Sequence, residues 1–545
     1  MAEPIAWRRP RWATIGLWFA AILLVLLVVV PLFELFRGAI GEGWASAGQA
    51  FRAAGTATVV ANTLWTGAVA TVLAVVAGTA AAFVTERAHI PARNWLRWGL
   101  LLPLVTPPFV SALSWAQAYG PGGLTDDLAG WTVPGLFGGP GVVGVIAVNA
   151  APLAYLILAA GLATRVAPDL ERAARAAGSN GWETFRLVTL PLLRPALLGA
   201  AALVFVVSVN SFGIPAVLGS PAGFGTMTTR IYQDLARSAA PAAFTRVLVL
   251  AAALVVVTIT VVAVADRRFG LARVVVRTGG TTGSATPPGR RAWLPALALW
   301  VYVTITALIP LLALVLSSLT RAVGLSPIPA NWTLANFGEA LRGSYGAALG
   351  RSVSLAVVAA TLVVLLGGLA ASLSRRRFGR PIGTAAILTF AVPGSALAVA
   401  VLLAYGPWLR DTLMIILVAY LAKFWALGHR SIAGSADAIP PDLYRAARSG
   451  GAGPLTALRT VIVPLLRPAI AAAWAIVFLF GFHELTMSTL LYGPGSETLA
   501  VVILNLRQLG DVTVTSAMAV MLTALVVVAF APVWLVRRIA GRVPR

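Results

Sequence analysis

Long apolar runs separated by short polar segments fill most of the chain. Each run has about 20 residues, which is enough for a helix to cross the hydrocarbon core of a bilayer. The first run is too long for a signal-peptide core, so we expect it to be retained as a span. We expect twelve spans, at 13–36, 59–84, 99–118, 141–163, 196–219, 244–264, 293–316, 351–373, 382–404, 412–430, 469–491 and 514–536. The pattern therefore predicts an all-α polytopic membrane protein.

Composition agrees with this prediction, and the charges indicate an orientation. Hydrophobic residues make up 59% of the chain and charged residues 11%, with a mean hydropathy of +0.88. A net charge of +23 would suggest a nucleic-acid partner in a soluble protein. Here thirty of the forty arginines fall in loops on one side of the expected spans. Because arginine-rich loops stay in the cytoplasm, we expect both termini to be cytoplasmic and no nucleic acid to bind.

Several kinds of chemistry are excluded by residues that the chain lacks. It has no cysteine, which excludes disulfides, iron–sulfur clusters and thiolate metal sites. The histidines His89, His429 and His483 are too scattered to form a His-rich metal site. The single lysine, Lys423, stands between Ala422 and Phe424, so the chain has no Walker A motif. If ATP drives this protein, another subunit hydrolyses it.

A segment of 29 residues occurs twice. PDLERAARAAGSNGWETFRLVTLPLLRPA at 168–196 and PDLYRAARSGGAGPLTALRTVIVPLLRPA at 441–469 align without a gap, with 16 identical positions. The repeat predicts two tandem six-helix halves, 1–264 and 293–545, joined by a flexible cytoplasmic linker at 265–292. Because six is even, the halves share one orientation, and their pseudo-two-fold axis lies along the membrane normal.

Each copy of the segment predicts a short polar helix outside the membrane. Pro168 and Pro441 suit the first helical turn, where a missing N–H costs nothing. Gly178 and Gly451 suit the residue that ends a helix. A helix of about ten residues is marginal in isolation, so it needs a surface to pack on. From the residues alone, the alternative is an ordinary basic helix that lies on the membrane surface.

The two segments resemble the EAA loop of the permeases of ABC importers, in which E-A-A is followed by three residues and Gly, and nine residues later by I-x-L-P. The family's Glu is Arg172 in one copy and Arg445 in the other, so no contact of that Glu is carried over. The matching positions are the ones that the resemblance implicates in ATPase coupling: Ala173, Ala174, Gly178 and Pro191, and again Ala446, Ala447, Gly451 and Pro464.

The resemblance implies a fold, a location and partners. It implies the type I ABC importer permease fold in the inner membrane of a bacterium, with a non-catalytic chain that binds no cofactor of its own. ATP and Mg²⁺ would belong to a partner ATPase, present in two copies, whose grooves receive the two short helices. An extracytoplasmic binding protein would deliver the substrate.

Two further segments, 210–235 and 483–511, look like those of the fused ferric-iron permeases. Related permeases import thiamine, polyamines, phosphonates or sulfate, and these remain alternatives. Ferric iron would take carboxylate or phenolate oxygens, for which Asp126, Asp127, Asp234 and Tyr232 are external candidates. The alternative is that these are solvated loop residues. Since the resemblance assigns the substrate to the binding protein, we predict no metal site in this chain.

The pathway candidates are Asn210, Ser211, His483 and Glu484, which occupy matching positions in the two halves. Glu484 falls inside an expected span, where an ionisable group costs roughly 2.5–3.5 kcal/mol on insertion scales. It either lines the pathway with the other three or has a structural partner, His483 or Lys423.

Two other classes of protein fit less well. An ion-coupled secondary transporter usually has ionisable groups in several spans, whereas here only Lys423 and the pair His483–Glu484 lie well inside. A membrane-embedded enzyme would need paired carboxylates or a nucleophile motif, and neither occurs within a span.

Overall fold

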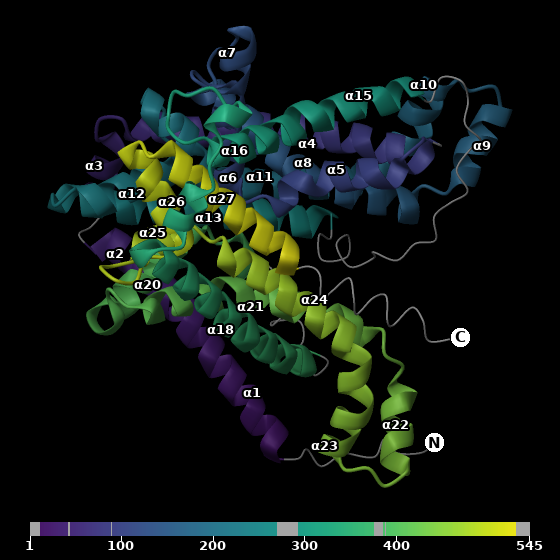
Figure 1. Cartoon of the computed structure of the whole chain (residues 1–545). Coiled ribbons are helices and arrows are strands. Elements are labelled where there is room, and N and C mark those ends of the chain that lie inside the picture. Colours follow the sequence, from purple (N-terminus) through teal and green to yellow (C-terminus); the bar gives the residue numbers. More distant parts are fainter. Residues whose placement is uncertain are drawn as a thin grey trace. The chain divides into compact units, whose positions relative to one another are not determined.

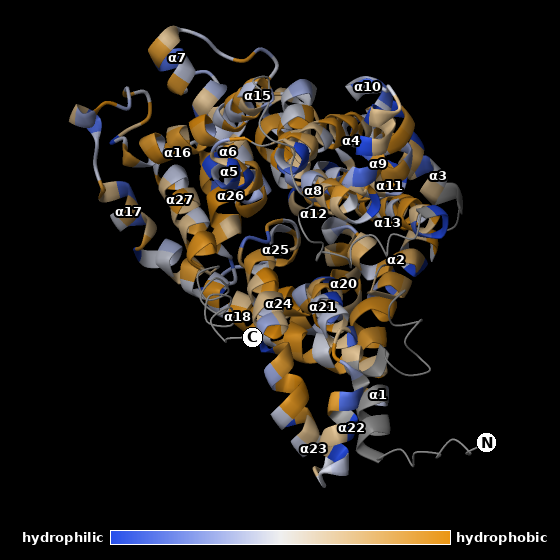
Figure 2. Cartoon of the chain, turned by 90° about the vertical axis from the view of Figure 1, so that its right-hand side faces the viewer, coloured by the Kyte–Doolittle hydropathy of each residue, from blue (hydrophilic) through white to orange (hydrophobic). Residues whose placement is uncertain are grey.

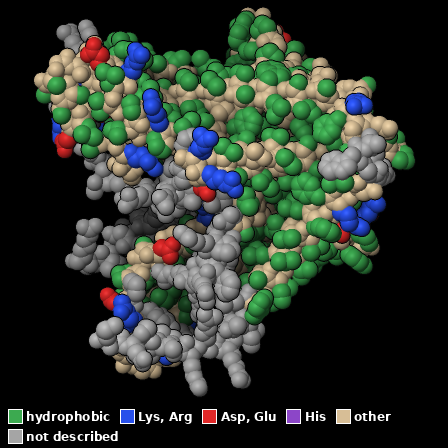
Figure 3. Space-filling model, turned by 180° about the vertical axis from the view of Figure 1, so that it is seen from behind, with side chains coloured by type: hydrophobic (Ala, Val, Ile, Leu, Met, Phe, Trp, Pro, Cys, Tyr) green, Lys and Arg blue, Asp and Glu red, His purple; other side chains and the backbone are tan. Residues whose placement is uncertain are grey.

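The computed structural model describes residues 11–41, 44–88, 90–269, 293–374, 385–386 and 388–529 (Figure 1). These residues are almost entirely helical, and their only β pairing is a single bridge between Thr320 and Trp332. Most helices are largely orange in Figure 2, the colour of hydrophobic residues, and hydrophobic side chains cover much of the surface seen in Figure 3. Among the described residues, ten helices are long and apolar enough to cross a membrane, and a bent pair would make eleven. The chain is therefore an all-α polytopic protein, as predicted.

The helices form two compact units, and each unit draws on both of the predicted halves. The first unit comprises Met1–Gly41, Gly350–Glu497 and Val527–Arg545, and the second comprises Glu42–Leu349 and Thr498–Val526. The two tandem halves remain a prediction about the sequence repeat, because the compact units do not follow their boundaries. Most of the linker expected at 265–292 lies outside the described residues.

In the first unit the helices are α1 (Arg11–Leu24), α2 (Val30–Gly41), α18 (Gly343–Ser374, which begins in the second unit), α20 (Gly394–Leu409), α21 (Leu413–Asp437), α22 (Pro441–Ser449), α23 (Pro454–Ala457), α24 (Val463–Phe482) and α25 (Thr486–Leu491). In the second unit they are α3 (Trp44–Arg52), α4 (Thr56–Arg87), α5 (Arg93–Val105), α6 (Pro108–Tyr119), α7 (Leu124–Ala129), α8 (Gly139–Arg165), α9 (Pro168–Ala176), α10 (Gly181–Thr184), α11 (Leu190–Val209), α12 (Met227–Arg237), α13 (Pro241–Phe269), α15 (Trp293–Val303), α16 (Ile309–Leu319), α17 (Ala335–Ala340), α26 (Leu499–Leu509) and α27 (Val512–Ala529).

Four of the five π-helical turns among the described residues lie within long helices and share one sequence signal. They cover Val25–Val29, Phe185–Thr189, Thr304–Leu308 and Leu458–Ile462, and in each case a proline follows two residues after the turn. Proline has no N–H to donate, and its ring collides with the carbonyl four residues earlier. Widening the preceding turn relieves that collision while the helix continues. The prolines therefore modify these helices without ending them.

Three expected spans differ from the structure in a consistent way. The span at 99–118 is a pair of helices, α5 and α6, bent by 106° at Thr106–Pro107. The spans at 196–219 and 469–491 are each broken, after Val209 and after Phe482. They also begin earlier than expected, because helix continues from Gly181 to Val209 and from Leu458 to Phe482, through the prolines expected to mark their start. Hydropathy averaged over a window cannot detect a break of two or three residues.

Close helix contacts in the second unit depend on small residues. A Cβ atom added to Gly78 on α4 would lie 2.7 Å from the Cβ of Ala154 on α8. On α5, a Cβ at Gly99 would lie 2.8 Å from Cγ1 of Val303 on α15. The first span of the second half, α15 and α16, thus packs against helices of the first half.

Candidate functional site: coupling loops and helix breaks

The first repeated segment begins with the short helix α9, Pro168–Ala176, with its proline in the first turn. The helix ends at Gly178, whose φ of +96° lies in the left-handed region that glycine adopts without strain. The N–H of Gly178 donates to the carbonyl of Arg175 (3.0 Å), and the N–H of Ser179 donates to the carbonyl of Ala174 (3.1 Å). This pair of bonds is a Schellman motif, which satisfies the last carbonyl groups of the helix.

The second segment repeats this geometry. Its helix α22, Pro441–Ser449, ends at Gly451, which has a φ of +84°. The N–H of Gly451 donates to the carbonyl of Arg448 (3.1 Å), and the N–H of Ala452 donates to that of Ala447 (3.1 Å). The chain therefore presents two short helices of the same length with the same C-terminal stop, one in each unit.

The predicted coupling residues lie where a partner could reach them. Ala173 and Ala446 are exposed, Ala174 and Ala447 are half-buried, and Gly178 and Gly451 are exposed. Pro191 and Pro464 are half-buried and lie within the long helices that follow. Both helices contain polar residues, seen in blue in Figure 2, and each also exposes one leucine, Leu170 (48%) and Leu443 (43%).

A buried carboxylate holds α9 in place. Glu171 is 6% exposed, and its carboxylate lies 3.3 Å from Nε of Arg87 at the end of α4. The hydroxyl of Thr189 donates to the same carboxylate (2.8 Å), and Arg87 also donates to the carbonyl of Val166 (2.7 Å). The short helix is thus joined to a long span and to the helix that follows it. The sequence indicated Glu171 only as a charge near the helix start, and its partner lies 84 residues away. In the second copy Tyr444 takes this position.

The break in the second half is shaped by Glu484. α24 ends at Phe482 and α25 begins at Thr486, so Glu484 lies between them. Its carboxylate accepts hydrogen bonds from the N–H of Met487 (2.9 Å to both oxygens), the N–H of Ser488 (3.0 Å) and the hydroxyl of Ser488 (3.2 Å). A carboxylate there satisfies free N–H groups and complements the positive end of the helix. Among the described residues it forms no ion pair with His483 or Lys423, the partners considered from the sequence.

Lys423 donates hydrogen bonds to carbonyl groups at a second helix break in the same unit. α20 begins after Pro393, and Lys423 Nζ donates to the carbonyls of Val392 and Phe390 (3.3 Å to the latter). Tyr420, one turn earlier on α21, has its hydroxyl 2.8 Å from the hydroxyl of Ser488. Lys423 and Glu484 thus both bind backbone groups at the ends of interrupted helices.

The matching break in the first half is neutral and less saturated. α11 ends at Val209, and Asn210 and Ser211 follow. Within the described residues, Asn210 Oδ1, Ser211 Oγ and the nearby Ser208 Oγ have no hydrogen-bond partner, and neither does His483 Nδ1 in the other unit. Pro215 stands where the second half has Ser488, so no N–H requires an acceptor there. The four pathway candidates thus lie at helix breaks, two in each unit.

Asp234 and Tyr232, two of the residues considered as iron ligands, lie in a packed environment. Asp234 is 6% exposed, and its carboxylate is held by Arg246 (2.6 and 2.7 Å) and Arg230 (3.0 and 3.1 Å). Tyr232 is also buried. The interpretation of these two residues as solvated loop residues is therefore wrong, because α12 and α13 bury them. The described residues contain no group of three His, Cys, Asp or Glu that could hold a metal ion.

Comparison with known proteins finds membrane transport components that are similar to this chain. A family model described as a binding-protein-dependent transport system inner membrane component matches residues 71–270 and again 363–544. A ferric transport system permease protein of Actinobacillus pleuropneumoniae is 26% identical over 491 residues, covering 84% of this chain and 68% of that protein. An Fe(3+)-transport system permease protein of Haemophilus influenzae is 24% identical over 500 residues, covering 91% and 92%. A protein named for 2-aminoethylphosphonate transport in Salmonella typhimurium is 30% identical over 224 residues, covering 40% and 84%.

Proposed function

Because the chain belongs to the family of binding-protein-dependent transport system inner membrane components, we propose that it forms the whole transmembrane pathway of an ATP-driven importer. The family match occurs twice, so one chain supplies two permease segments. It is a multi-pass protein of the bacterial inner membrane. We further propose that both termini are cytoplasmic, which the arginine distribution supports.

The observation that carries the proposal is the pair of short helices α9 and α22. Both begin with proline, expose alanine and leucine, and stop at a glycine in the left-handed region. Each is followed by a single helix of 29 or 25 residues, Gly181–Val209 or Leu458–Phe482, which leads into the membrane. At 1.5 Å per residue these helices are roughly 37–44 Å long, more than the ~30 Å hydrocarbon core. Movement of either short helix would therefore be transmitted along the long helix that follows it to the break at the far end of that long helix.

In this proposal the partners supply what the chain itself does not. Two copies of an ATPase bind α9 and α22 and hydrolyse ATP with Mg²⁺, and this chain binds no cofactor. An extracytoplasmic binding protein delivers the substrate to the external mouth. Asn210, Ser211, His483 and Glu484 line the pathway, with Glu484 acting chiefly by fixing the shape of its break.

The substrate best supported is ferric iron. Two relatives that cover most of the chain are named for ferric transport. A phosphonate is the second candidate, favoured by the match to the 2-aminoethylphosphonate protein over part of the chain. Uptake into vesicles that contain the permease and its ATPase, with the binding protein loaded with one substrate or the other, separates these candidates.

The coupling role is tested by crowding the two short helices. Ala174→Trp and Ala447→Trp place a bulky side chain where a partner's backbone must come close, so each variant should lose ATPase binding and ATP-driven uptake. Ala330→Trp, at an exposed alanine outside the repeated segments, is the matched control. Unimpaired ATPase binding and uptake in both coupling variants would contradict the proposal.

A further inference from the structure

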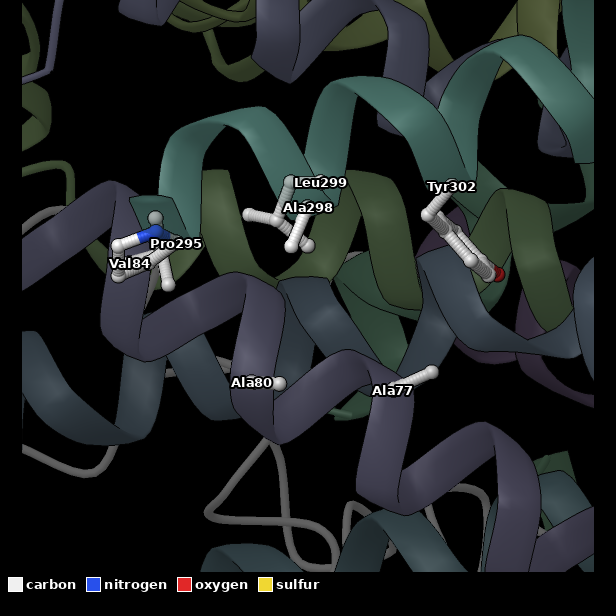
Figure 4. Close-up of a pocket in the computed structure, with 7 residues that line it drawn as sticks. All are labelled: Ala77, Ala80, Val84, Pro295, Ala298, Leu299 and Tyr302. Atoms are coloured by element: carbon white, nitrogen blue, oxygen red, sulfur yellow. The ribbon is translucent and has the colours of Figure 1, made fainter. Parts of the chain in front are cut away.

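A groove of about 300 Å³ lies between α4 and α15 in the second unit (Figure 4). Val84 and Pro295 lie at one end, Ala77 and Tyr302 toward the other, and Ala80 and Ala298 between them. Every side chain that lines it is hydrocarbon apart from the hydroxyl of Tyr302. The groove is therefore apolar and runs along two neighbouring helices.

The groove exists because small side chains face one another where the two helices pack. Toward its C-terminus α15 is held close to α5, where Val303 fits against Gly99. Along the groove the facing positions are Ala77 and Ala80 on one helix and Ala298 on the other, which leave a gap that larger side chains would fill. The two helices come from different halves of the sequence, so the groove marks the joint between them.

The surroundings of the groove determine what can fill it. Both α4 and the helix formed by α15 and α16 belong to the candidate membrane spans, so the groove opens toward lipid hydrocarbon. Water does not stably occupy an apolar cavity that offers no hydrogen-bond partners. A methylene group takes up about as much space as a water molecule, roughly 30 Å³, so the groove holds on the order of ten methylene groups. That volume matches much of one acyl chain.

One end of the groove adjoins interfacial and cationic residues. α4 ends at Arg87, three residues after Val84, and α15 begins at Trp293, two residues before Pro295. Trp293 is 55% exposed, and α5 exposes Trp95 and Trp98 by 73% and 65%. Exposed tryptophans mark the membrane–water boundary, where lipid headgroups lie. A lipid headgroup is thus complementary to this end of the groove.

We propose that the groove binds one acyl chain of a phospholipid whose headgroup lies at the C-terminal end of α4, near Trp293. The chain fills the joint between α4 and α15 and so stabilises the attachment of the second half's first span to the second unit. This proposal is independent of the transported substrate. It would survive if the importer carried a phosphonate.

The test uses the full-length protein in phosphatidylethanolamine vesicles that contain a phosphatidylglycerol with a photoreactive diazirine on its acyl chain. After illumination, mass spectrometry of peptide fragments locates the modified residues. Labelling should concentrate on 77–84 and 295–302 and should exceed that of Val72 and Val76, which are 62% and 63% exposed on α4 but do not line the groove. Equal labelling of all lipid-exposed residues would overturn the proposal.

Filling the groove provides the second arm. Ala80→Phe and, separately, Ala298→Leu should reduce groove labelling roughly tenfold, the factor expected for losing the burial of about two methylene groups. Val76→Phe is the matched control on the same helix and should leave labelling unchanged. Size-exclusion chromatography confirms folding, and the milder Ala298→Leu serves if Ala80→Phe does not fold. Undiminished labelling in a folded filled variant would refute lipid binding.

Discussion

Removing the carboxylate of Glu484 tests whether it holds the break between α24 and α25. In Glu484→Ala, the N–H groups of Met487 and Ser488 lose their acceptor. An unpaired buried donor costs about 1–3 kcal/mol, so the two together cost roughly 2–6 kcal/mol. Glu484→Gln keeps one acceptor oxygen and should cost about half as much.

The first half supplies the matched control. Ser211 occupies the position of Glu484, but its hydroxyl has no partner in the described residues and Pro215 has no N–H to satisfy. Ser211→Ala should therefore change stability by no more than about 0.5 kcal/mol. Thermal denaturation of the purified proteins, followed by size-exclusion chromatography, should rank them as wild type and Ser211→Ala, then Glu484→Gln, then Glu484→Ala. If Glu484→Ala and Ser211→Ala lower the midpoint equally, the capping role is wrong.

Three further predictions use the same structure. Because the chain has no cysteine, single cysteines at Ser179 and Gly283 should react only with reagents added from the cytoplasm, and a cysteine at Thr125 should react only from outside. Labelling at Gly283 from outside would show that the predicted orientation is wrong. Glu171→Gln weakens the charge-assisted bonds that hold α9, so ATPase binding should fall severalfold while membrane insertion stays normal, as pull-down from membranes can measure. Asp234→Asn leaves two half-buried arginines without a carboxylate, and the cost of about 1.5–3 kcal/mol should appear as a lower denaturation midpoint.

Features encoded locally could be predicted from the sequence. The short helices were predictable because proline at the start and glycine at the end act within a few residues, as the φ values of Gly178 and Gly451 show. The spans were predictable because hydropathy is a property of about 20 residues. The four π-helical turns within long helices carried a usable signal as well, a proline two residues after each turn.

Features set by distant or backbone contacts could not be predicted in this way. The partner of Glu171 is Arg87, and no periodicity connects residues so far apart. The sequence suggested side-chain partners for Glu484. In the structure its carboxylate oxygens instead accept hydrogen bonds from backbone N–H groups, which are free only because the helix breaks there. Similarly, Asp234 carries no sign in the sequence that α13 would bring Arg246 to it.

The mixed membership of the two compact units has a consequence for biosynthesis. The second unit lacks α15, α16 and α17 until residue 340 has left the ribosome, and it lacks α26 and most of α27 until residue 526 has done so. The first unit needs both the initial helices and residues up to 497. Contacts between segments so distant in sequence form slowly. Helices inserted early therefore remain in the bilayer without their native packing partners until the later segments are synthesised. A chain truncated between the two halves would leave both units incomplete.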